Sequence, residues 1–179
     1  METRSVNILV LGVGNLLLQD EGAGVRALEM FQRKYETPEG IECLDGGTSG
    51  MELLHHIDGR DRLIILDVVK GEGRPGTVVR LEADEVPALF RKRISPHQLG
   101  LSDLLAAASF SGKMPRELVL LGIEPKAFDT GLEMSEEVAE SMETVADMVA
   151  AELLSCGVAV RTRTAMPGGG GLHCPAWPG

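Results

Sequence analysis

The stretch that decides the fold reads ILVLGVGNLLLQDEGAG and spans residues 8–24. A buried strand is predicted over residues 6–11, because continuous Val, Ile and Leu character is typical of a parallel sheet. A glycine-rich turn follows, and apolar side chains recurring every three or four positions predict a helix over residues 21–35. The turn thus brings two carboxylates, Asp20 and Glu21, to a helix start, where the helix dipole alone would favour them.

The rest of the chain repeats this alternation of strands and helices. Further strands are predicted at residues 41–44, 63–66, 77–81 and 118–123. The loop over residues 70–76 is too short for a helical crossover, so the strand that follows it is predicted to run antiparallel to its predecessor.

Helix starts are indicated by serine at three places. Ser49 and Glu52 fit a capping box, in which each side chain bonds the other residue's backbone. A second helix is predicted from Ser95, with proline next to it, or from Ser102. The last begins at Ser135, with two glutamates in its first turn. One or two helical turns are also expected over residues 84–90.

This order predicts an α/β fold. We expect a three-layer sandwich: a five-stranded, mostly parallel, twisted sheet with one antiparallel strand and helices on both faces. Residues 1–160 are predicted to form a single domain, and the Gly/Pro-rich tail over residues 161–179 is predicted to be disordered. Ligands of such sheets lie beyond the carboxyl ends of the strands.

The composition of the chain argues against some classes of binding partner. The 179 residues carry a formal net charge of −10, which disfavours nucleic acid because phosphate contacts need clustered Lys and Arg. No apolar run approaches the roughly 20 residues of a membrane helix, and no signal peptide is recognisable, so we expect a cytoplasmic protein without a membrane partner. The scattered Cys43, Cys156 and Cys174 suggest no disulfide framework.

Two interpretations of the glycine-rich turn compete. A dinucleotide fingerprint GxGxxG would need a third glycine where this chain has Leu17, and Asp20 and Glu21 would repel a pyrophosphate at the helix start. A metal site is favoured instead. Glu21, Asp67 at the end of the third strand and His97 are predicted to reach one sheet edge.

Two carboxylates and an imidazole suit Zn²⁺, Ni²⁺ or Mn²⁺, with positions open for water or substrate. Such a site could polarise a carbonyl and activate a water for hydrolysis. Structural roles stay open for each residue: a helix-start charge for Glu21, a strand-end turn for Asp67 and a hydrogen-bonded turn for His97. His55 and His56 are predicted to be structural or exposed.

Four motifs, in order, resemble one family. They are the glycine-rich stretch over residues 12–24, DGGTSGMELL over 45–54, LIILD over 63–67 and ISPHQLGL over 94–101. Together they resemble the [NiFe]-hydrogenase maturation endopeptidases, and the resemblance covers roughly residues 6–158.

The resemblance implies specific roles. Glu21, Asp67 and His97 match the family's metal-binding residues, and Asp45 matches an aspartate that serves substrate binding or cleavage. It implies an endopeptidase that removes a short C-terminal peptide from the hydrogenase large-subunit precursor after nickel insertion. The nickel would come with the substrate, although other divalent metals can occupy such a site, and the enzyme is expected to be a monomer. The alternative is a non-catalytic metal-sensing module or chaperone that escorts the precursor.

Overall fold

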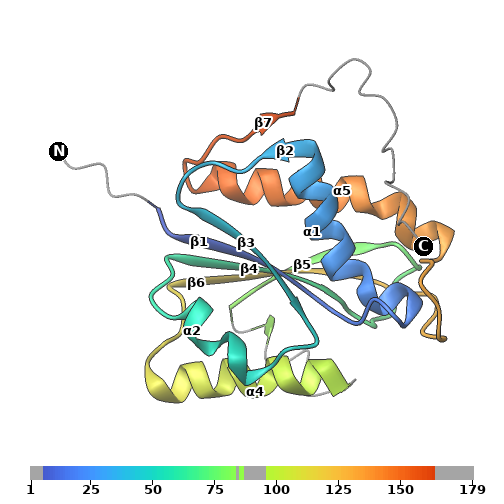
Figure 1. Ribbon diagram of the computed structural model, residues 1–179, viewed down its shortest axis with the longest axis horizontal. Coiled ribbons are helices and arrows are strands. Elements are labelled where there is room, and N and C mark those ends of the chain that lie inside the picture. The colour runs from blue at the N-terminus through green and yellow to red at the C-terminus, as the bar shows by residue number, and fades with distance from the viewer. Residues whose placement is uncertain (1–5, 84, 87–95, 164–179) are drawn as a thin grey trace, which may run out of the picture.

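The computed structural model describes residues 6–83, 85–86 and 96–163, and the side chains of Pro96 and His97 lie outside that description. Its main sheet has five strands in the order β3-β1-β4-β6-β5 (Figure 1). Their bounds are β1 Ile8–Val13, β3 Ile41–Gly47, β4 Arg62–Val68, β5 Val78–Glu82 and β6 Glu117–Ile123. Strands β3, β1, β4 and β6 are parallel, and β5 is antiparallel to β6. The predicted α/β fold is confirmed.

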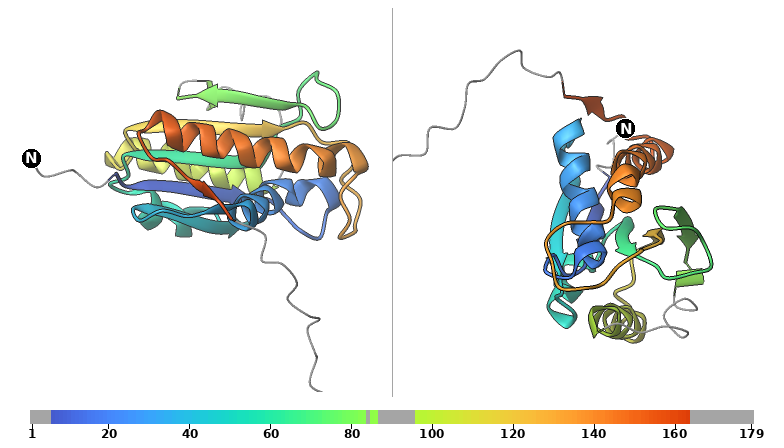
Figure 2. Two further views of the ribbon diagram at one scale, coloured as in Figure 1. Left: turned by 90° about the horizontal axis from the view of Figure 1, so that it is seen from above. Right: turned by 90° about the vertical axis from the view of Figure 1, so that its right-hand side faces the viewer.

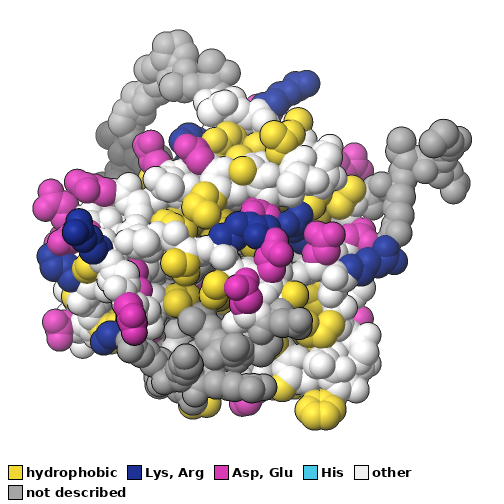
Figure 3. Space-filling model, turned by 180° about the vertical axis from the view of Figure 1, so that it is seen from behind, with side chains coloured by type: hydrophobic (Ala, Val, Ile, Leu, Met, Phe, Trp, Pro, Cys, Tyr) yellow, Lys and Arg dark blue, Asp and Glu magenta, His cyan; other side chains and the backbone are white. Residues whose placement is uncertain are grey.

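The antiparallel direction of β5 is confirmed, but its neighbour differs from the simplest expectation. β5 pairs with β6 and not with β4, the strand that precedes it in the chain. β6 is almost entirely buried, whereas every residue of β5 is partly exposed or exposed. An interior position therefore suits β6, and the sheet edge suits β5. Figure 3 is seen from this edge, where Lys and Arg side chains lie beside Asp and Glu side chains.

Helices cover both faces of the sheet, as predicted. Helices α1 (Ala23–Lys34) and α5 (Glu136–Ser155) lie on one face, and α2 (Leu54–Ile57) and α4 (Pro96–Ser111) lie on the other (Figure 2). Short 3₁₀ turns, η1 (Gln19–Gly22) and η2 (Met51–Leu53), precede α1 and α2. Within the described residues, no helix combines the length and apolarity that a bilayer crossing requires.

Alternation along the strands builds two separate cores. Ile8 and Val10 of β1 belong to a cluster with α1 and α5, whereas Leu9 and Leu11 belong to a cluster with α4. Residues two apart on a strand share a face, so a continuous apolar run serves both helical layers. This explains why β1, β4 and β6 lack the alternating pattern of a half-exposed strand.

A two-stranded antiparallel ribbon was not predicted. Strand β2 (Tyr35–Glu36) pairs with β7 (Arg161–Thr162), and the Arg163 N–H donates to the Lys34 carbonyl at 2.8 Å. The first residues assigned to the tail thus form a strand at the end of α1. Residues 164–179 lie outside the described part, so the predicted disorder of the tail stays a prediction there.

The predicted helix starts differ in detail. The capping box is wrong: Gly50 caps η2, and Glu52 accepts the Gly50 N–H at 3.1 Å, while Ser49 makes no side-chain cap. α4 begins at Pro96, as the Ser95 alternative predicts, although Ser95 itself lies outside the described residues. Most of the predicted turns over residues 84–90 lie outside them too. Ser135 caps α5 by position, without a side-chain cap bond.

The start of α1 lies in direct contact with two strands. A Cβ placed on Gly24 would lie 2.1 Å from the Leu66 carbonyl oxygen of β4 and 2.3 Å from that of Val13 in β1. A Cβ on Gly12 would lie 2.7 Å from the Gly24 carbonyl oxygen. All three distances are far inside van der Waals contact. Glycine is therefore required for α1 to approach the sheet this closely.

We expect Gly24→Ala to lower the free energy of unfolding by roughly 2–3 kcal/mol, because backbone must shift to admit the methyl group. At an ordinary helix position, Gly→Ala raises the free energy of unfolding by about 1 kcal/mol. A decrease at Gly24 would therefore indicate the close contact with the sheet. Urea unfolding measures the effect. Gly73→Ala is the control, since its Cβ would meet nothing closer than 3.5 Å. A Gly24→Ala protein as stable as the parent would contradict the close approach.

Candidate active site at the carboxyl edge of the sheet

The parallel strands end together at one edge, and the register aligns the predicted site residues there. Gly12 of β1 pairs with Asp45 of β3 on one side and with Leu66 of β4 on the other. Asp67 follows Leu66 directly. Neighbouring strands lie about 4.8 Å apart, so the backbones of Asp45 and the end of β4 are separated by about 10 Å.

Asp67 is fully buried near the end of β4. Its Oδ1 accepts the Val68 N–H at 2.7 Å. Ile65 and Leu63, two and four residues before it, belong to the core cluster with α4, so strand alternation places Asp67 on that same face. A buried carboxylate thus follows a row of buried aliphatic side chains at the edge of the sheet. Because burying a carboxylate costs free energy, packing in the core does not explain why Asp67 is there.

Glu21 reaches this edge through η1, which contacts β4. The residue is only 5% exposed, and its N–H donates to the Leu18 carbonyl at 3.1 Å. A Cβ on Gly14 would lie 1.9 Å from the Glu21 carbonyl oxygen, and Gly14 has φ +133°, so only glycine fits there. The second glycine of the turn therefore positions Glu21.

The first turn of α4 is held against the same edge. The Gln98 side-chain amide donates to the Val68 carbonyl at 3.0 Å, one residue beyond Asp67. Gly100 lies against Gly50, and a Cβ added to Gly50 would lie 3.1 Å from the Gly100 backbone. His97 belongs to this turn, and its side chain lies outside the described part of the structure. The fold thus brings Glu21, Asp67 and the backbone of His97 to one edge.

Asp45 differs from the two buried carboxylates because its side chain is exposed. Its Oδ1 accepts the Gly47 N–H at 2.9 Å, which closes a local turn at the end of β3. One carboxylate oxygen thus stabilises the turn. The side chain remains open to solvent, where a substrate backbone could approach it.

The described residues do not test whether Glu21, Asp67 and His97 bind a metal ion. They contain no group of three or more His, Cys, Asp and Glu arranged to hold a metal ion. The predicted set of Glu21, Asp67 and His97 includes an imidazole that lies outside them. That set therefore stays a prediction.

Asp20 has a structural role that its position in the sequence did not reveal. It is fully buried and accepts the N–H groups of Lys126, Ala127 and Ser135 at 2.7–2.9 Å, together with the Ser135 hydroxyl at 2.9 Å. Burial on its own raises the pKa of Asp20, but these hydrogen bonds together outweigh it and leave the pKa below its usual value. Asp20 therefore ties η1 to the loop before α5.

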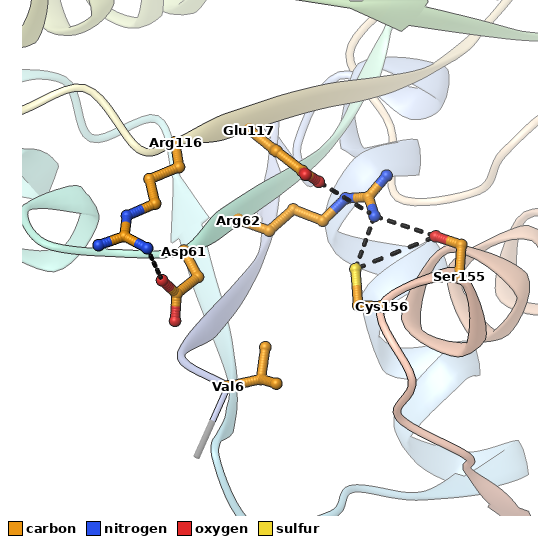
Figure 4. A pocket seen from close by; sticks show the side chains of 7 residues that line it. All are labelled: Val6, Asp61, Arg62, Arg116, Glu117, Ser155 and Cys156. Carbon is orange, nitrogen blue, oxygen red and sulfur yellow. Dashed lines mark hydrogen bonds and ion pairs between the residues drawn. The ribbon is translucent and has the colours of Figure 1, made fainter. Parts of the chain in front are cut away.

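The pockets that can be described lie elsewhere. One of about 320 Å³ lies at the opposite edge, where the strands begin, and its lining includes Arg62 and Cys156 (Figure 4). The Arg62 guanidinium donates to the Cys156 sulfur at 2.6 Å and to Glu152 at 2.6 Å. Neither Glu21, Asp45 nor Asp67 is among its lining residues. Its charged groups pair with one another, so it is explained as a structural ion-pair network.

Comparison with known proteins identifies the family. A family model described as hydrogenase maturation protease matches residues 25–152. The chain belongs to the hydrogenase maturation protease family. It is 45% identical over 162 residues to the hydrogenase 2 maturation protease of Escherichia coli K12, a match covering 90% of this chain and 99% of that protein.

Solved structures of this family agree with the fold. The hydrogenase maturating endopeptidase HybD from Escherichia coli superposes with a TM-score of 0.85 at 45% identity, covering 88% of this chain and 98% of HybD. HybD from Thermococcus kodakarensis gives 0.68 at 29% identity, covering 83% of this chain and 99% of the other. This chain is accordingly a hydrogenase maturation protease, a hydrolase of the endopeptidase class.

We expect Asp20→Asn to lower the free energy of unfolding by about 2–3 kcal/mol, because an amide nitrogen would face backbone N–H groups that now meet a carboxylate oxygen. Urea unfolding in the presence of a chelator measures the effect without any contribution from metal. Asp129→Asn, the same change at an exposed position in the same loop, is the control and should be neutral. Equal stability of the two variants would refute the structural role of Asp20.

Proposed function

We propose that this maturation protease removes the C-terminal peptide of a hydrogenase large-subunit precursor once nickel has been inserted. Glu21, Asp67 and His97 would bind the nickel that the precursor carries, and Asp45 would act in cleavage. The observation that carries the proposal is the meeting of η1, the end of β4 and the first turn of α4 at one edge, fixed by Gly14 and by the Gln98–Val68 hydrogen bond.

The donor chemistry supports a metal that belongs to the substrate. Two carboxylates and an imidazole are suitable ligands for a divalent transition metal and leave coordination positions for groups of a second protein. A metal bridging enzyme and precursor would bind both more tightly than either alone, so an unloaded precursor would be held weakly. Cleavage would thereby depend on completed nickel insertion, with the metal treated as part of the substrate.

The exposed carboxylate of Asp45 supports a role nearer the scissile bond. It lies two strands from Asp67, so it could reach backbone adjacent to a metal held at the end of β4. A carboxylate there can accept a proton from an attacking water or orient the peptide. Glu21 and Asp67, which are buried, are less suited to that task.

We expect His97→Ala to abolish processing of a nickel-loaded precursor while leaving the urea midpoint unchanged. Shortening of the precursor is measured by mass spectrometry. His55→Ala, on the exposed side of α2, is the matched control and should process normally. Normal processing by His97→Ala would show that the metal assignment is wrong.

We expect Asp45→Asn to slow cleavage by about a hundredfold or more while the precursor still binds. Asparagine keeps an oxygen that can accept the Gly47 N–H, so the turn should survive and only the charge is lost. Single-turnover cleavage and precursor affinity are measured separately. If cleavage continues at the parent rate, Asp45 has no catalytic role. If the parent protein binds the precursor without cleaving it, the escort alternative replaces the protease proposal.

A further inference from the structure

The solvent face of α4 is unlike the rest of the surface. Among the 16 residues of α4, Asp103 is the only Asp, Glu, Lys or Arg, whereas charged residues make up 25% of the chain. α5, on the opposite face of the sheet, carries acidic residues throughout its length. A helix that covers a sheet with one side normally presents charged side chains on the other, so α4 departs from the expected pattern.

Apolar side chains predominate on this face and recur there at helical spacing. Leu101, Leu104, Leu105 and Ala108 are buried against the sheet. On the other side lie Leu99, Asp103, Ala106 and Phe110, which are four, three and four positions apart and therefore form one stripe. We call these four residues the α4 stripe. Leu99 is 47% exposed and Phe110 is 95% exposed.

The α4 stripe extends from the candidate active site. Leu99 lies next to Gln98, whose amide bonds the carboxyl end of β4, and eleven residues of helix carry the stripe about 16 Å further, to Phe110. Met51, 49% exposed, adjoins Gly50, which lies against Gly100. At the lower right of Figure 3, where the C-terminal half of α4 lies, the side chains are hydrophobic or uncharged. The apolar surface is thus continuous with the site edge.

We propose that the α4 stripe is the docking surface for the folded body of the large-subunit precursor, an inference that rests on the proposed function. A partner whose C-terminal segment enters the site must cover the adjoining surface, and the stripe begins there. Exposed aromatic and aliphatic side chains in a surface that is poor in charge are typical of the centre of a protein interface. The partner patch is therefore mainly apolar, with Phe110 as the anchor furthest from the site.

A second copy of this chain fits the stripe less well. Two molecules of net charge −10 repel one another, and the stripe offers no basic side chain to offset that repulsion. A copy bound there would also lie across the edge at which the substrate must arrive. Neither objection applies to the precursor.

The test compares Phe110→Ser with Leu154→Ser. Leu154 is 62% exposed on α5, across the sheet from α4, so it is a matched loss of an exposed apolar side chain. Processing of the nickel-loaded precursor is measured over a range of precursor concentrations. We expect Phe110→Ser to raise KM at least tenfold with kcat within twofold of the parent, and Leu154→Ser to change neither. Because the Phe110 side chain is exposed, the urea midpoint of the Phe110→Ser variant should equal that of the parent.

Each other outcome has a clear meaning. An unchanged KM for Phe110→Ser overturns the docking surface while leaving the proposed function intact. Failure of the parent protein to cleave overturns the proposed function, and the affinity of the two variants for the precursor then tests the docking surface separately. Sedimentation tests the remaining alternative. If the parent protein is a dimer and the Phe110→Ser variant is a monomer, the α4 stripe binds a second copy of the chain and the proposal is overturned.

Discussion

Backbone contact between Gly24 of α1 and the carbonyl groups of Val13 and Leu66 is the constraint on which the site depends. It fixes the start of α1 against two neighbouring strands at once. The turn before the helix has no freedom to move away, so η1 and Glu21 must lie beside the end of β4. Glycines that suggest a phosphate-binding loop therefore serve helix-to-sheet packing, and the carboxylates of Asp20 and Glu21 disfavour a phosphate at this helix start.

The two adjacent carboxylates at this turn have different tasks. Asp20 is enclosed by donors from the segment before α5, and its negative charge is stabilised by backbone N–H groups. This anchors η1 to the loop between β6 and α5. Glu21, the next residue, is the one that the family resemblance assigns to metal. The protein uses one carboxylate to hold the turn so that the next can be presented at the sheet edge.

The sequence predicted the layers because continuous apolar runs and helical spacing are local signals. It predicted the edge at which Glu21, Asp45 and Asp67 meet, since parallel strands end together. It did not predict that β6 lies between β4 and β5, nor the pairing of Tyr35 with Thr162, because these depend on contacts between distant segments. The role of Asp20 depends on a loop more than 100 residues away, so no local pattern indicates it.

The distribution of charge suggests how the fold separates solubility from recognition. Acidic side chains are concentrated on α5, on the face of the sheet away from α4, and pairs such as Lys126 with Glu137 are solvated there. The α4 stripe carries a single charged side chain, Asp103, although it borders a site built from carboxylates. A substrate that brings its own cation is attracted by those carboxylates, while an apolar neighbour selects the protein that carries it. Metal and docking surface together would then discriminate a loaded precursor from free metal and from unloaded protein, which neither could do alone.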